Sequence, residues 1–208
     1  MKKLVLASKN KGKIEELERL LAGNAFEITV LGLNEFPNMP EVIESGKSLS
    51  ENAWLKAEQI AEFTGLPALA DDSGLFIDAL SGDPGIYSSR WAEYAGVDAQ
   101  ARDQLNIEKV LAQLVNTPIG KRGAQFRSVV AFYISNLAGK VFKQEQVGEL
   151  KGEITLVPAG DNGFGYDPIF IPEGFDKTLA QLNSGQKDEI SHRGKAMRAI
   201  SPYLLKYL

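Results

Sequence analysis

The chain contains 208 residues, of which 44% are hydrophobic and 24% charged, and 23 Lys and Arg against 27 Asp and Glu give a net charge of −4. It has no cysteine and one histidine, His192, which excludes thiol nucleophiles, disulfides, thiolate zinc sites and multi-histidine metal clusters. The acidic balance argues against a general nucleic-acid-binding protein, because such binding relies on basic surface.

Apolar segments are short throughout the sequence. Only Leu4 to Ala7 are apolar after the first three residues, too few for the core of a signal peptide. The longest apolar run, Val129 to Ile134, is far below the roughly 20 residues of a membrane span. We therefore expect a soluble, cytoplasmic protein with no membrane partner.

In the first part of the chain, apolar residues recur in turn with the spacing of a strand and with the spacing of a helix. Lys3 to Ala7 predicts a buried strand, a helix with apolar residues on one face is expected from Lys11 to about Gly23, and residues 26–31 predict a second strand. A loop over 34–48 precedes a helix that begins with a possible capping box, Ser48 to Glu51, and stops at Gly65. This order favours an α/β architecture.

The rest of the chain changes character after an acidic turn. A short strand at 68–70 is expected to end abruptly at Asp71-Asp72-Ser73-Gly74 before strand character resumes. The further predicted elements are a strand at 75–80, a turn at 82–85, a helix at 99–116, antiparallel strands at 124–135, 140–147 and 150–156, a glycine-rich loop at 160–165, and helices at 176–184 and 193–207. The length suits a single folding unit, residues 1–208, with two lobes.

Five places carry residues suited to chemistry. The segment Ser8 to Lys13 joins a strand end to a helix start, where free N–H groups and the helix dipole can bind an anion. Lys13 in the first turn opposes that dipole, which makes more sense if an anion lies between them. An N-cap at Asn10 followed by solvated lysines explains the same segment equally well.

The adjacent carboxylates of Asp71 and Asp72 follow a strand, the usual location of ligands in α/β sheets. In an extended chain they point in opposite directions, so one can face a cleft, as a cation ligand or a base, while the other braces the turn. An ordinary Asp-Ser-Gly turn is the alternative. Asn52 and Lys56 lie on one helix face, with Glu44 in the loop before it, although Glu44 and Lys56, taken singly, are better interpreted as solvated.

An aromatic residue between two glycines, Phe164, can present its ring to a nucleobase, although a hairpin loop with a buried Phe is the simpler interpretation. Farther on, Lys187 could meet phosphate and Arg193 could read the O6 and N7 edge of a purine. A helix start with basic residues also accounts for this segment. A Ser-His-Asp triad would require His192, but no Gly-x-Ser-x-Gly elbow supplies the serine.

Six segments, taken in order, closely resemble the inosine triphosphate pyrophosphatase family. They are Ser8-x-Asn10-x-x-Lys13, Glu51-Asn52-Ala53, Ala70-Asp71-Asp72-Ser73-Gly74-Leu75, Pro84-Gly85-Ile86-Tyr87-Ser88-Ser89-Arg90, Gly163-Phe164-Gly165-Tyr166-Asp167-Pro168 and Ser191-His192-Arg193. The resemblance extends from residue 4 to about 200, without a departure at any motif position.

The resemblance implies a homodimeric, Mg²⁺-dependent hydrolase that converts noncanonical purine nucleotides (ITP, dITP and XTP) to the monophosphate and pyrophosphate, which removes them from the nucleotide pool. The implied fold is α/β, an elongated twisted mixed β-sheet flanked by helices, with two lobes and a central nucleotide-binding cleft. Glu44 and Asp72 would hold the metal, and Asp72 would be the catalytic base. The implied substrate-binding residues are Ser8, Lys9, Asn10, Lys11, Gly12, Lys13, Lys56, Ser73, Phe164, Gly165, Tyr166, Asp167, Lys187, His192 and Arg193.

The residues suit this chemistry. Magnesium prefers one or two carboxylates plus waters and phosphate oxygens, and a positioned carboxylate base typically contributes about 10²–10⁴-fold. Arg193 donating to O6 would favour 6-oxo purines, but guanine shares that edge, and the sequence does not identify what rejects GTP. Two alternatives stay open: a pyrophosphatase for pyrimidine or modified nucleotides on a similar fold, and a nucleotide sensor without turnover.

Overall fold

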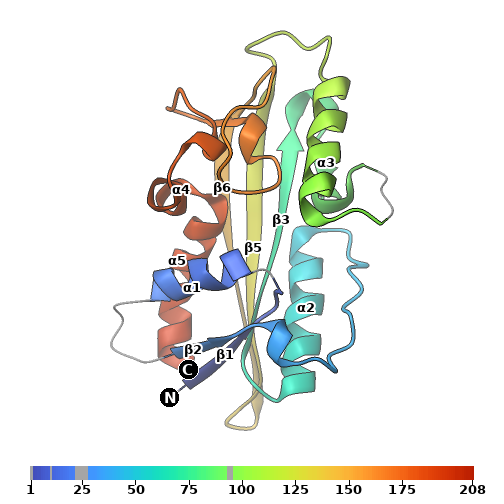
Figure 1. Ribbon diagram of the computed structural model, residues 1–208. Coiled ribbons are helices and arrows are strands. Elements are labelled where there is room, and N and C mark those ends of the chain that lie inside the picture. Colours follow the sequence, from blue (N-terminus) through green and yellow to red (C-terminus); the bar gives the residue numbers. More distant parts are fainter. Residues whose placement is uncertain (1, 10, 22–27, 93–95) are drawn as a thin grey trace. The chain divides into compact units, whose positions relative to one another are not determined.

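The computed structural model describes residues 2–9, 11–21, 28–92 and 96–208 (Figure 1). The chain divides into two compact units. The first contains Met1–Asp72, Ser128–Gly148 and Arg193–Leu208, and the second contains Ser73–Arg127 and Glu149–His192.

The strands form one mixed sheet, which confirms the predicted α/β class. They hydrogen-bond in the order β2-β1-β3-β5-β6-β7, with β4 paired to β3. Strand β1 is parallel to β2 and β3, whereas the β3–β4 and β6–β7 pairs are antiparallel. Their bounds are β1 Lys2–Leu6, β2 Ile28–Leu31, β3 Ala68–Ile77, β4 Pro84–Gly85, β5 Gly123–Leu137, β6 Lys140–Ile154 and β7 Phe170–Pro172.

Five α-helices accompany the sheet in the described part of the chain. They are α1 Lys11–Leu21, α2 Leu49–Thr64, α3 Ala99–Gln113, α4 Ser184–Ile190 and α5 His192–Tyr207. Short 3₁₀ turns lie at Leu33–Glu35, Asp78–Leu80, Ser88–Arg90, Asp167–Ile169 and Leu179–Gln181. Of the helices described, none combines the length and the apolar character needed to cross a membrane.

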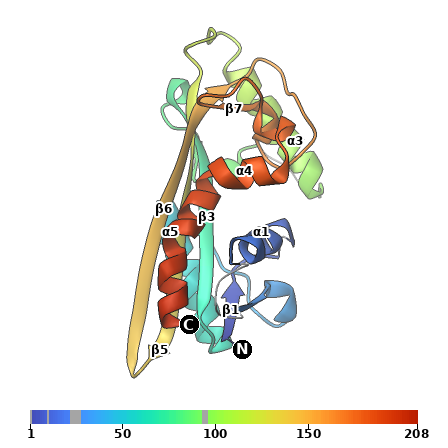
Figure 2. The same ribbon diagram turned by 90° about the vertical axis from the view of Figure 1, so that its left-hand side faces the viewer.

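The core of the first unit lies where α1 and α5 pack on the strands (Figure 2). Leu4 and Leu6 of β1 meet Leu17 of α1, and the Ile200 and Leu204 side chains of α5 complete the contact. Full burial of such side chains contributes about 1.5–3 kcal/mol each. This packing fixes β1 and the start of α1, which carry the first predicted anion-binding segment.

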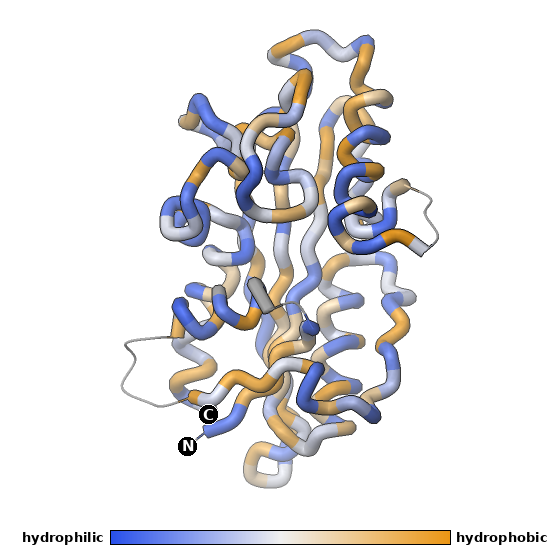
Figure 3. The backbone as a smooth tube through the Cα atoms, in the orientation of Figure 1, coloured by the Kyte–Doolittle hydropathy of each residue, from blue (hydrophilic) through white to orange (hydrophobic). Residues whose placement is uncertain are grey.

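The core of the second unit includes the apolar face of α3, where Ile107, Val110 and Leu114 are buried against β5 and β6 residues. The trace of α3 accordingly alternates between hydrophobic and hydrophilic colours (Figure 3). Asp98 is the N-cap of this helix and accepts a hydrogen bond from the Ala101 N–H at 2.8 Å. An apolar face and a good cap together explain why this segment is helical.

A buried arginine anchors the other end of α3. The Arg122 side chain donates to the backbone carbonyls of Leu114, Thr117, Ile154 and Thr155 at 2.7–3.2 Å. Burial lowers the pKa of Arg122, so these carbonyl dipoles are what compensate the buried guanidinium. Helix α3 is thereby joined to the end of β6.

The predicted break at the two aspartates is wrong. Strand β3 runs without interruption through Asp71-Asp72-Ser73-Gly74, because both carboxylates are neutralised by cations from other elements. Gly74 serves close packing and not a turn. A Cβ placed there would lie 2.3 Å from the carbonyl oxygen of Gly85 in the paired strand β4, so no larger residue fits.

Three further expectations need correction. Strand β6 is continuous where two strands, 140–147 and 150–156, were expected. The helix expected at 176–184 is replaced by a 3₁₀ turn and by α4, which starts only after the N-cap Asn183. In the predicted capping box, Ser48 Oγ does accept from the Glu51 N–H, but the Glu51 carboxylate accepts from the Lys47 N–H and not from that of Ser48.

Candidate functional site

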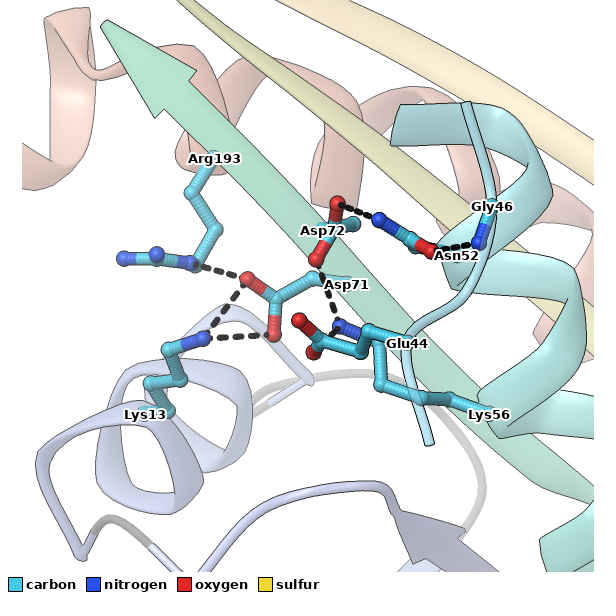
Figure 4. Close-up of polar contacts among 8 residues, drawn as sticks. All are labelled: Lys13, Glu44, Gly46, Asn52, Lys56, Asp71, Asp72 and Arg193. Atoms are coloured by element: carbon cyan, nitrogen blue, oxygen red, sulfur yellow. Dashed lines mark hydrogen bonds and ion pairs between the residues drawn. The ribbon is translucent and has the colours of Figure 1, made fainter. Parts of the chain in front are cut away.

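Seven polar residues of the first unit form the charged cluster (Figure 4). They come from α1, the loop before α2, α2 itself, β3 and the start of α5, and they are Lys13, Glu44, Asn52, Lys56, Asp71, Asp72 and Arg193. Five of the seven were candidates from the sequence for the substrate or the metal. The other two, Asn52 and Asp71, were outside that set.

Asp71 binds two cations. Its carboxylate accepts from Lys13 Nζ at 3.0 and 2.9 Å and from Arg193 Nε at 3.0 Å, and its side chain is 1% exposed. The anion expected near Lys13 is therefore present within the protein itself. Because both partners come from other elements, Asp71 fixes α1 and the start of α5 to the centre of β3.

Asp72 faces a different set of partners. Its Oδ1 accepts from Lys56 Nζ at 2.7 Å, and Asn52 Nδ2 lies 3.4 Å from Oδ2. The expectation that Asn52 and Lys56 share a helix face is confirmed, since both reach the same carboxylate from consecutive turns of α2. Asn52 is fully buried, and the Lys56 side chain is only 13% exposed, so the interpretation of Lys56 as a solvated residue is wrong.

The loop before α2 brings a second carboxylate to Lys56. Glu44 Oε1 accepts from Lys56 Nζ at 3.0 Å, so one ammonium contacts both Glu44 and Asp72. The loop is held by the Gly46 N–H, which donates to Asn52 Oδ1 at 2.8 Å. A Cβ at Gly46 would lie 2.6 Å from that same oxygen, so glycine permits the close approach.

The charges of the cluster shift one another's pKa values. Burial opposes ionisation of Asp71, but Lys13, Arg193 and Lys56 outweigh it and hold its pKa well below the usual range. Burial also lowers the pKa of Lys13, which Asp71 only partly offsets because Arg193 lies nearby.

The pKa values of Asp72 and Lys56, the two residues that lie beside Glu44, are shifted in another way. Burial raises the pKa of Asp72, against the opposing effect of Lys56. Burial also disfavours the Lys56 ammonium, yet Asp72, Asp71 and Glu44 together raise its pKa. Lys56 is therefore held as a cation among three carboxylates. The oxygens of these carboxylates also suit the binding of a further cation.

The second unit contains the aromatic loop, residues 163–167. Phe164 is 44% exposed, which contradicts a buried Phe, and Lys187 Nζ lies 4.8 Å from its ring centroid. Lys187 also pairs with Asp167, whose Oδ2 accepts from the Phe164 N–H at 2.9 Å. The Tyr166 hydroxyl donates to the Ser88 carbonyl at 2.8 Å. A partly exposed aromatic ring suits stacking on a planar ligand.

The single histidine is also in the second unit. The His192 imidazole stacks on Phe126 with ring centroids 4.7 Å apart and an interplanar angle of 8°. His192 begins α5, and the next residue, Arg193, belongs to the first unit and binds Asp71. Another boundary between the two units falls between Asp72 and Ser73. Two of the predicted motifs therefore coincide with the places where the chain passes from one unit to the other.

The other predicted site residues can be placed more briefly. Ser8 is buried just after β1, Lys9 is exposed, and Ser73 is half-buried in β3. Lys11 and Gly12 begin α1. Asn10 lies outside the described residues. Among the residues that are described, no three His, Asp or Glu side chains form a metal-binding group, and the expected pair of Glu44 and Asp72 meets at Lys56.

Sequence reasoning missed three residues here. Asp71 was one of two adjacent aspartates, either of which could brace a turn, and Asn52 was placed on a helix face without a role in the site. Asp103, from α3, accepts from the Gly165 N–H at 2.7 Å. Nothing in the local sequence marks it, since its partner lies 62 positions away.

Comparison with known proteins identifies the family. The model of the Ham1 family matches residues 4–203. The chain belongs to the Ham1 family. This membership confirms the resemblance drawn from the six motifs.

Relatives in the Ham1 family match over almost the whole chain. The dITP/XTP pyrophosphatase of Streptomyces coelicolor is 44% identical over 208 residues, 100% of both chains. That of Yersinia pseudotuberculosis is 47% identical over 200 residues, 95% of each chain. A solved HAM1 protein from Coxiella burnetii is 40% identical, with a TM-score of 0.85 over 99% of this chain and 100% of that one. A dITP/XTP pyrophosphatase structure from Mycobacterium abscessus has a TM-score of 0.74 at 40% identity, over 97% and 99%.

Proposed function

We propose that this protein hydrolyses noncanonical purine nucleoside triphosphates (ITP, dITP and XTP) to the nucleoside monophosphate and pyrophosphate. The relatives named dITP/XTP pyrophosphatase support this activity. The observation that carries it is the contact of one ammonium, Lys56, with the carboxylates of both Glu44 and Asp72, beside the buried Asp71. Such a set offers both cations for phosphate and oxygens for a divalent metal.

The donor set fits Mg²⁺. Glu44 and Asp72 are hard oxygen ligands whose oxygens converge on one point, where Lys56 Nζ lies 3.0 and 2.7 Å from them. Magnesium typically takes one or two protein carboxylates and completes its shell with water and substrate phosphates. When bound, it would neutralise charge on the triphosphate and on the departing pyrophosphate.

The remaining chemistry belongs to the charged cluster. We assign Lys13 and Lys56, with the Ser8–Lys13 segment, to the triphosphate. Asp72 holds a water and accepts its proton as the water oxygen bonds to the α-phosphorus. The bond from the α-phosphorus to the bridging oxygen then breaks, and that oxygen leaves on pyrophosphate. No covalent intermediate is needed, which suits a chain without cysteine.

Base selection is assigned to the aromatic loop, Lys187, His192 and Arg193. The exposed ring of Phe164 suits stacking on a purine. Arg193 is oriented by its ion pair with Asp71, and a donor held in place favours an O6 acceptor over the amino group of adenine. Ser73, directly after Asp72, completes the proposed substrate site.

Assembly and location are part of the proposal. From its family we propose that the protein is a cytoplasmic homodimer. Its small-molecule partner is the nucleotide substrate, and neither nucleic acid nor a membrane is involved. Light scattering on the purified protein tests the homodimer directly. A monomer at micromolar concentration would contradict it.

A product-resolved nucleotide panel, run with and without Mg²⁺, tests the activity. We expect ITP, dITP and XTP to yield monophosphate and pyrophosphate only when Mg²⁺ is added, with ATP and GTP cleaved far more slowly. Release of three orthophosphates, or equal rates for ATP and GTP, would contradict the proposal. Preferential cleavage of a pyrimidine nucleotide would show that the substrate is a pyrimidine and not a purine nucleotide. Tight binding without turnover would indicate a nucleotide sensor.

A further inference from the structure

We infer that Asp103 is a positioning residue for the base-binding loop, an inference that rests on the proposed function. Asp103 lies on α3 and accepts from the Gly165 N–H at Oδ2, over 2.7 Å. It belongs to none of the six motifs. Both residues are in the second unit, so the contact is internal to that unit.

The backbone conformation of the aromatic loop requires glycine at two positions. Gly163 and Gly165 have φ values of 81° and 62°, in the left-handed region that disfavours other residues. A Cβ at Gly163 would lie 2.1 Å from Asp167 Oδ2. This geometry turns two successive N–H groups, those of Phe164 and Gly165, toward carboxylates.

The two carboxylates have different effects. Asp167 accepts from the Phe164 N–H three positions away, so this bond closes the loop on itself. Asp103 accepts from the next N–H across 62 positions, so it attaches the loop to α3. Hydrogen bonds to an ionised acceptor are about twice as strong as neutral ones. The first bond therefore closes the loop, and the second holds Gly165, next to Phe164, against α3. Tyr166, whose hydroxyl donates to the Ser88 carbonyl, anchors the far side of the loop.

Helix α3 is a firm support for that attachment. Its N-terminus is capped by Asp98, its C-terminal carbonyl at Leu114 accepts from the buried Arg122, and Val110 is fully buried. Asp103 lies on this helix in a half-buried position. A carboxylate on a helix held at both ends can hold a loop in place without moving itself.

The consequence falls on the ring of Phe164. Lys187 lies over the ring and also pairs with Asp167, but neither residue is bonded to α3 in the described contacts. Without Asp103, the loop keeps its internal bonds while the ring samples more positions. In a variant without Asp103, ordering the ring when the nucleotide binds then costs conformational entropy. The wild-type protein has already lost that entropy on folding.

The test compares Asp103→Ala with wild type on two ligands. We expect KM for ITP to rise about tenfold while kcat stays within threefold, because the defect lies in holding the base. Inorganic triphosphate has no base, so its inhibition constant against ITP should stay within twofold. General damage to the fold would move both values together.

Two control variants accompany it. Asp103→Asn keeps a carbonyl oxygen as acceptor and should restore KM for ITP to within threefold of wild type. Glu108→Ala, on the same helix, removes an exposed carboxylate that contacts Gln104 and should leave KM unchanged. Amide exchange without nucleotide should be faster at residues 163–166 in Asp103→Ala alone.

The inference is overturned if Asp103→Ala leaves both KM for ITP and amide exchange of the loop unchanged, or if triphosphate inhibition weakens as much as ITP binding. Failure of the proposed function looks different. In that case wild type itself would not hydrolyse ITP, whereas faster exchange of the loop in Asp103→Ala would still establish the attachment to α3.

Discussion

The guanidinium Nε of Arg193 lies 3.0 Å from Oδ2 of Asp71, across 122 positions of sequence. Lys13 Nζ lies 2.9 Å from the same oxygen. The residue assigned to the triphosphate and the one assigned to the base thus share one carboxylate. A change at Asp71 should therefore affect both stability and the orientation of two substrate contacts.

Asp71→Asn should reduce the free energy of unfolding by about 3 kcal/mol, because it removes the carboxylate charge that pairs with the buried Arg193 and the partly buried Lys13. Urea denaturation followed by circular dichroism measures this change. Glu58→Gln is the matched control, since Glu58 pairs with Lys143 at the surface and its loss should cost less than about 1 kcal/mol. Equal losses in the two variants would show that Asp71 contributes no more than a surface pair.

Asp72→Asn should lower kcat for ITP by at least about 100-fold, since an amide cannot accept the proton of the attacking water. Binding of ITP, followed by calorimetry, should weaken far less than kcat falls. Asp78→Asn, at an exposed position just beyond β3, serves as the control and should retain full activity. Unchanged turnover in Asp72→Asn would remove this residue from the mechanism.

Lys13→Ala should raise KM and lower kcat for ITP, with a combined loss of about 10–100-fold in kcat/KM, the usual worth of a hydrogen bond to a charged group. Steady-state kinetics with ITP as substrate measures both constants. Lys3→Ala removes an exposed lysine of β1 and should leave both as in wild type. If KM does not change in Lys13→Ala, the start of α1 does not bind phosphate.

Asn52→Ala should weaken the apparent affinity for Mg²⁺ about 10–100-fold, because Asn52 contacts Asp72 and also holds the Gly46 loop that carries Glu44. Activity titrated with Mg²⁺ at saturating ITP reports this affinity. Gln59→Ala, on an exposed face of the same helix, is the control. A titration curve identical to wild type would mean that Asn52 supports the helix but not the carboxylates.

Local sequence patterns were sufficient to predict much of the fold. The apolar period of α2, its N-cap Ser48 and its stop at Gly65 are local features, and they were confirmed. The interruption expected in β3 was wrong because two aspartates and a glycine favour a turn when judged by their neighbours. What keeps the strand extended is charge from Lys13, Lys56 and other distant elements.

The same distinction applies to the candidate site. Asp72 could be predicted because it falls in a motif with a familiar order, and Lys56 because it lies one helical turn after Asn52 of another motif. Asp71 and Asn52 were in those motifs but needed their contacts to be assigned a part. Asp103 could not be predicted, since its only visible role is one hydrogen bond to a backbone N–H far along the chain.

Gly74 limits how this protein could be re-engineered. Any side chain there would collide with the Gly85 carbonyl of β4, so a library randomised at this position should return glycine alone. Position 74 is therefore closed to variation, two residues after the proposed catalytic base Asp72. Attempts to evolve a new nucleobase preference should instead randomise the aromatic loop and its support on α3.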